Sequence, residues 1–84
     1  MAKIAQDKTI NCEGLTCPEP ILQTTLTLTK MEAGQILLMS STDPTSVNDM
    51  RAWSIQTGHK ILKEEKDGNL YKFYIQKSDE RNNL

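Results

Sequence analysis

The chain has 84 residues, 37% hydrophobic and 25% charged, which suits one two-layer domain and is too short for a second core. A formal net charge of −1 argues against nucleic-acid binding, and no apolar run approaches the ~18 residues of a membrane span. Residues 1–8 lack the apolar stretch of a signal peptide. A cytoplasmic location is therefore expected, where thiols stay reduced unless they take part in chemistry.

The chain predicts alternating strands and helices, beginning with a short strand at Lys8–Cys12. A helix is expected from Pro18 to about Met31, because proline suits the first helical position and Cys17 then becomes the N-cap. Residues 24–29 alternate like a strand, but the proline start and the stop at Gly34 favour a helix. Its buried stripe is expected to comprise Ile21, Leu22, Thr25, Leu26 and Leu28.

Residues 36–39 are apolar on both faces and predict a central strand. Asp43-Pro44 then repeats the start pattern, with an oxygen-bearing N-cap followed by proline at the first helical position. The second helix is expected to run to about Thr57 and to end at Gly58. Its buried residues are expected to be Val47, Met50 and Trp53 or Ser54.

Two further strands are expected at Lys60–Glu65 and Leu70–Lys77, with a turn at Asp67-Gly68. Tyr71, Phe73 and Ile75 should share one face of the last strand. The order β-α-β-α-β-β predicts an α/β (α+β) two-layer sandwich, with a mixed four-stranded sheet and two helices on one face. Residues 1–77 are expected to form a single domain and residues 78–84 a polar, frayed tail.

Cys17, in the run Gly14-Leu15-Thr16-Cys17-Pro18-Glu19-Pro20, is the candidate catalytic residue. A thiol at a helix start lies against unpaired backbone N–H groups and the positive end of the helix dipole. That environment favours the thiolate, which is the nucleophilic form. The residue also follows the first strand, and sites in open parallel sheets lie at the carboxyl ends of the strands.

Cys12 and His59 each have two interpretations. Packing as a small core residue is favoured for Cys12, and the alternative is a resolving thiol, which requires its Cα atom within ~7 Å of that of Cys17. A solvated loop position is favoured for His59 over a Cys–His nucleophile pair. No metal site is expected, because two cysteines and one histidine lack paired Cys-x-x-Cys spacing.

The motif Gly14-Leu15-x-Cys17-Pro18-x-Pro20, together with Asp43-Pro44 and Gly58-His59, resembles the TusA/SirA-like sulfur-carrier family over about residues 9–77. The resemblance implies a cytoplasmic sulfurtransferase that accepts sulfane sulfur as a persulfide on Cys17 and passes it to an acceptor protein. Supporting positions would be Gly14, Pro18, Glu19 and Pro20. No cofactor is implied, because sulfur itself is the cargo.

The implied partners are a sulfur donor of the cysteine desulfurase or rhodanese type and an acceptor protein of a sulfur relay. The carrier would be a monomer without direct contact to nucleic acid or membrane. Transfer RNA thiolation, cofactor assembly and dissimilatory sulfur oxidation would all use this chemistry. The remaining alternatives are a thiol redox switch, in which Cys12 and Cys17 form a disulfide, and a non-catalytic regulatory interaction module.

Two positions depart from the family pattern. The family commonly has Asp where this chain has Asn11, and a small residue such as Ala where it has Cys12. Asn11 keeps an acceptor oxygen but loses the negative charge. If its side chain lies near Cys17, that loss should favour the thiolate slightly.

Overall fold

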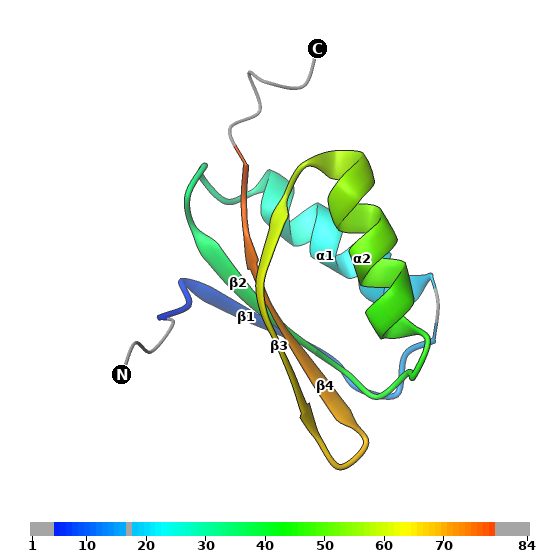
Figure 1. Cartoon of the computed structure of the whole chain (residues 1–84). Helices are drawn as coiled ribbons and strands as arrows, with labels where there is room; N and C mark the ends of the chain where they lie inside the picture. The colour runs from blue at the N-terminus through cyan, green and yellow to red at the C-terminus, as the bar shows by residue number, and fades with distance from the viewer. Residues whose placement is uncertain (1–4, 17, 79–84) are drawn as a thin grey trace.

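The computed structural model describes residues 5–16 and 18–78. Its elements are β1 (Lys8–Cys12), α1 (Glu19–Thr29), β2 (Ile36–Ser41), α2 (Ser46–Thr57), β3 (Lys60–Asp67) and β4 (Leu70–Gln76). The strands form one sheet in the order β1-β2-β4-β3; β1 and β2 are parallel, and the other neighbouring pairs are antiparallel. Both helices cover one face of this sheet (Figure 1). The predicted two-layer fold is confirmed.

The core lies between this sheet face and the two helices. Alternation along β2 buries Leu37 and Met39, as expected for a central strand. On β4, Ile75 lies opposite Leu37 and Phe73 lies opposite Met39, and both are buried. The other buried apolar residues of this cluster are Cys12, Leu28, Met31, Met50 and Trp53.

α1 begins one residue later than predicted, with Pro18 as its N-cap and Pro20 at the second helical position. The reason is a turn in front of the helix, in which the Glu19 N–H donates to the Thr16 carbonyl at 2.8 Å. A helical hydrogen bond then joins the Leu22 N–H to the Pro18 carbonyl at 3.0 Å. The helix also ends at Thr29 instead of Met31, because tighter turns follow it.

The buried side of α1 differs from the predicted stripe. Pro20, Thr24 and Leu28 are buried, whereas Leu22 is 48% exposed and Leu26 58% exposed. Thr24 is accommodated in the core because its Oγ1 donates to the Pro20 carbonyl at 2.7 Å, which leaves no hydroxyl unpaired. The prediction that the two leucines are buried is therefore wrong.

α2 packs beside α1 and begins two residues later than predicted, at Ser46. Asp43-Pro44 forms a turn before the helix: Asp43 Oδ1 accepts hydrogen bonds from the backbone N–H and the hydroxyl of Thr45. Met50 and Trp53 are buried as expected.

Trp53 Nε1 donates to Thr25 Oγ1 at 3.0 Å, which links α2 to α1. Thr25 is nevertheless exposed, against the prediction that it belongs to the buried stripe. A polar side chain at this rim can hydrogen-bond to the indole and still reach solvent.

β3 and β4 form the predicted hairpin, with its turn shifted by one residue. Asp67 pairs with Leu70, so the loop is Gly68-Asn69 instead of Asp67-Gly68. Gly68 has φ 63, which a hairpin loop of two residues commonly requires. β3 therefore extends to Asp67, beyond the predicted end at Glu65, and contains an irregularity between Ile61 and Lys63.

Candidate transfer site

The N-termini of both helices lie at one edge of the sheet. β1 and β2 are parallel, and each leads directly into a helix, so α1 and α2 begin beside the carboxyl ends of these strands (Figure 1). We call this region, residues 13–16, 18–20 and 42–46, the carboxyl edge. Helix dipoles place partial positive charge there, and open sheets bind ligands at such edges.

Two hydrogen bonds shape the loop between β1 and α1. Asn11 Oδ1 accepts from the Glu13 N–H at 2.8 Å and closes a turn at the end of β1. The Gly14 N–H donates to Thr42 Oγ1 at 2.9 Å, which ties this loop to the one that follows β2. Gly14 has φ 81, a left-handed conformation that other residues rarely adopt. Asn11 thus supplies an acceptor oxygen, which an aspartate at this position would also supply.

Cys17, the predicted catalytic residue, lies outside the described residues. The described residues on either side show what the start of α1 offers an anion. The Glu19 N–H is already bonded to the Thr16 carbonyl, and Pro18 and Pro20 have no N–H to donate. The start of α1 therefore offers an anion fewer backbone hydrogen-bond donors than the first turn of a helix without these prolines and this turn.

Cys12 is 1% exposed and belongs to the apolar core. Burial raises the pKa of its thiol, and the negative charge of Glu19 raises it further. The thiol is therefore protonated at neutral pH, and a protonated, buried thiol is a poor nucleophile. This buried position agrees with the favoured packing role of Cys12. That Cys12 is not a resolving thiol for Cys17 stays a prediction.

His59 lies in the loop between α2 and β3, as predicted, but it is half-buried instead of solvated, and this loop is at the end of α2 remote from the carboxyl edge. Its ring stacks on Trp53 with 5.4 Å between the ring centroids. Its Nδ1 accepts a hydrogen bond from the Ser78 N–H at 3.0 Å, which anchors the chain after β4. These contacts give His59 a packing role and oppose the alternative of a Cys–His nucleophile pair.

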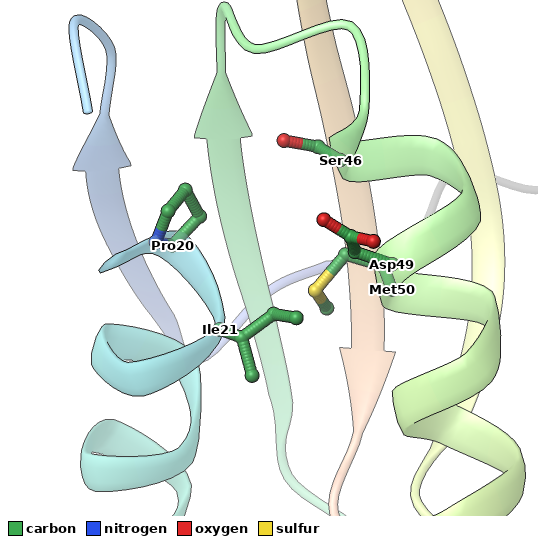
Figure 2. Close-up of a pocket in the computed structure, with 5 residues that line it drawn as sticks. All are labelled: Pro20, Ile21, Ser46, Asp49 and Met50. Carbon is green, nitrogen blue, oxygen red and sulfur yellow. The ribbon is translucent and has the colours of Figure 1, made fainter. Parts of the chain in front are cut away.

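A shallow surface cleft lies between the starts of α1 and α2 (Figure 2). Its lining comprises Pro20, Ile21, Ser46, Asp49 and Met50. Asp49 is the charged residue of this lining. The Ser46 hydroxyl is hydrogen-bonded to the Ser41 hydroxyl at 2.7 Å. The sequence analysis does not identify this cleft, although the two proline-preceded helices after parallel strands are its signal.

Among residues 5–16 and 18–78, no three metal-binding side chains gather in one place. Neither α1 nor α2 has the length and apolar composition that crossing a membrane requires.

Comparisons with known proteins relate the chain to sulfur carriers. Residues 8–77 match the family described as sulfurtransferase TusA. The chain is 42% identical over 71 residues to a putative sulfur carrier protein of Bacillus subtilis, covering 84% of this chain and 95% of the relative. It is 40% identical over 72 residues to the sulfur carrier protein TusA of Allochromatium vinosum, covering 86% of this chain and 95% of the relative.

The fold is similar to that of a SirA-like protein from Desulfitobacterium hafniense. The TM-score is 0.73 over 86% of this chain and 99% of the other, with 22% sequence identity. At this identity the likeness concerns the fold alone, and it agrees with the mixed four-stranded sheet and paired helices described above.

Proposed function

The chain belongs to the TusA sulfurtransferase family and is a sulfur carrier, and from this premise we propose that it holds sulfur as a persulfide on Cys17. The burial of Cys12 is the observation that carries the proposal. The sequence has two cysteines, and one of them is 1% exposed with a raised thiol pKa. A carrier thiol must enter partner pockets, so the role falls to Cys17, next to the exposed Pro18.

The chemistry is sulfane exchange. The Cys17 thiolate attacks the outer sulfur of a donor persulfide, so that a new S–S bond forms at Cys17. The S–S bond of the donor breaks, and the donor cysteine leaves as a thiolate. An acceptor thiolate then attacks the outer sulfur on Cys17 in the same way. Each step exchanges one S–S bond for another and requires no added oxidant or reductant.

The residues around Cys17 are proposed to aim the sulfur. Pro18 and Pro20 restrict φ at the start of α1, and the bond from Gly14 to Thr42 holds the loop against its neighbour. Glu19 lies in the first turn of α1, where its charge raises the pKa of the Cys12 thiol. We propose that Glu19 helps to keep the buried thiol out of the exchange.

The donor is proposed to be a cysteine desulfurase or a rhodanese, and the acceptor another thiol protein of a sulfur relay. Both contacts must be short-lived, because one thiol serves the two partners in turn. Short-lived complexes commonly bury less surface than permanent ones. We place the relay in the cytoplasm, where both thiols stay reduced between transfers.

The test is the mass of the intact protein after incubation with a persulfide donor. We expect a gain of one sulfur, ~32 Da, which a reductant removes. Cys17→Ser should abolish the gain, and Cys12→Ala should retain it. Sulfur found on Cys12 would contradict the site assignment.

Two alternatives have their own readouts. A redox switch predicts an internal disulfide in a glutathione buffer, seen as the loss of two hydrogens. That disulfide would require Cys12 to leave the core. A non-catalytic interaction module predicts that Cys17→Ser keeps full function in a relay reconstituted from donor, carrier and acceptor.

A further inference from the structure

Thr42 ties together the two loops of the carboxyl edge. It follows β2 directly and is half-buried. Its Oγ1 accepts the hydrogen bond from the Gly14 N–H at 2.9 Å, although the two residues are 28 positions apart in the chain. Cys12 and Ser41, the last residues of β1 and β2, are paired in the sheet. The Thr42 bond therefore continues the contact between the two strands beyond their ends.

The backbone around Thr42 is itself held in place. Ser41 is fully buried, and its Oγ accepts a hydrogen bond from the Asp43 N–H at 3.1 Å. The hydroxyls of Ser41 and Ser46 are hydrogen-bonded to each other at 2.7 Å, which joins the end of β2 to the first residue of α2. These bonds fix the residues on both sides of Thr42, so its oxygen is offered to Gly14 from an anchored position.

The turn that contains Gly14 has its own internal hydrogen bonds. The Leu15 N–H donates to the Cys12 carbonyl at 3.1 Å, so residues 12–15 form a β-turn with Gly14 at its third position, where φ is 81. The Glu13 N–H donates to Asn11 Oδ1 at 2.8 Å. The N–H of the third residue takes no part in the bond that closes such a turn. The internal bonds therefore set the shape of the turn, and the Thr42 bond sets where the turn lies relative to α2.

We infer that Thr42 is a positioning residue for sulfur transfer between proteins. Through its bond to Gly14 it orients the chain that leads directly into Cys17. The inference rests on the function proposed for Cys17 and adds to it a residue outside the Cys17 motif that aims the sulfur. Exchange between two folded proteins requires the attacking thiolate to align with the S–S bond that breaks, and neither protein can turn freely once they are docked. A small sulfur donor, by contrast, chooses its own direction of approach.

The loss of this bond should change the orientation of the turn much more than the fold. Gly14 is exposed and Thr42 is half-buried, so water can replace the missing partner of the Gly14 N–H. The turn would then sample other positions, and the rate of transfer would fall with the fraction of molecules in the productive one. The net strength of a typical hydrogen bond corresponds to a fall of about three- to tenfold.

Three variants separate the hydrogen bond from the shape of the side chain. Thr42→Val keeps the branched shape and removes the acceptor oxygen, whereas Thr42→Ser keeps the oxygen and removes the methyl group. The matched control is Thr9→Val, which makes the same exchange at an exposed position of β1. Exchange of the Gly14 amide hydrogen, followed by NMR, reports the bond itself. We expect this exchange to be about three- to tenfold faster in Thr42→Val and unchanged in the other two variants.

Each protein is then loaded with sulfur in three ways. The first uses a cysteine desulfurase with cysteine, and the second a rhodanese with thiosulfate. The third uses inorganic polysulfide, from which the Cys17 thiolate takes one sulfur while the shortened polysulfide leaves. We expect kcat/KM for loading by a protein donor to fall about three- to tenfold in Thr42→Val and to be restored in Thr42→Ser. Thr9→Val should load like the parent protein, and polysulfide should load all four proteins at the same rate.

Several results would overturn the inference. They are parental rates for Thr42→Val with the protein donors, an equal loss in Thr42→Ser or Thr9→Val, unchanged exchange of the Gly14 amide in Thr42→Val, and failure of both protein donors to load the parent protein. An equal fall in polysulfide loading would also overturn it, because Thr42 would then act on the reactivity of the thiol instead of its orientation. Failure of polysulfide to load Cys17 of the parent protein is a different outcome, because it refutes the proposed persulfide function.

Discussion

The two cysteines should differ in reactivity by several orders of magnitude, and this difference tests the assignment of the carrier thiol. Alkylation with iodoacetamide is the perturbation, applied to the folded protein near pH 8. Cys12 is 1% exposed and its thiol pKa is raised, so the folded protein should protect it. Cys17, as the proposed carrier thiol, should react at the rate of an accessible thiolate.

The size of the protection follows from the opening that Cys12 requires. At about 0.05–0.15 kcal/mol per residue, a domain of 84 residues unfolds with about 4–13 kcal/mol. Since about 1.4 kcal/mol is a factor of ten, global opening would slow the alkylation of Cys12 at least about 10³-fold. Local opening of β1, which lies at the sheet edge, would place the factor near the lower end of this range.

The assay is peptide mapping by mass spectrometry at a series of labelling times, in buffer and in denaturing urea. We expect Cys17 to be modified first in buffer, and both cysteines at similar rates in urea. The Cys17→Ser variant should show the slow phase alone. Alkylation of Cys12 at the rate of Cys17 in buffer would refute the burial argument and favour the redox-switch alternative.

Three further predictions concern stability and the loop. Because the pKa of the Cys12 thiol is raised, the folded state keeps a proton that the unfolded chain loses above the ordinary thiol pKa of 9.0. The stabilisation from the protonated thiol is therefore complete below pH 9.0 and declines above it, so urea titrations should show the free energy of unfolding falling above pH 9.0 more steeply in the parent than in Cys12→Ala. The same pH dependence in both proteins would contradict the raised pKa. Trp53→Phe removes the hydrogen bond to Thr25 and part of the core, and we expect a loss of about 1–3 kcal/mol in thermal unfolding; unchanged stability would show that this contact is dispensable. The methyl group that Gly14→Ala adds would meet no atom within 4 Å, so the loss of stability should come only from the strain of an alanine at φ 81, about 1–2 kcal/mol. Sulfur transfer should slow by more than this loss of stability explains. An unchanged transfer rate would mean that Gly14 acts only on the fold.

The strands could be predicted because alternation and apolar runs reflect burial directly. Residues 36–39 show this, since their two-sided apolar pattern predicts the central position that β2 occupies. The buried face of α1 could not be predicted in the same way. Threonine reads as polar, but Thr24 satisfies its hydroxyl on the Pro20 carbonyl and takes a core position, which turns Leu22 and Leu26 outward.

The transfer site was predictable in part. The proline pattern marks Cys17 and the loop before α1, because proline restricts where a helix can begin. The absence of donors at Pro18 and Pro20 is visible in the sequence, but the loss of the Glu19 N–H was not predictable, because it depends on the turn from Thr16 to Glu19. The cleft lined by Asp49 could not be predicted, because it forms only where α2 lies beside α1. No local sequence pattern indicates that tertiary arrangement.

The direction of the strands has a consequence for how the carrier could be attached to other proteins. β1 begins beside Leu37, and β4 ends with Gln76 opposite Ile36. The chain segments before β1 and after β4 therefore connect to the sheet at the end of the strands remote from Gly14. The six residues of β2 separate the two edges by about 20 Å. A tag, a surface anchor or a flexible tether joined at either connection would therefore leave the loop between β1 and α1 unobstructed.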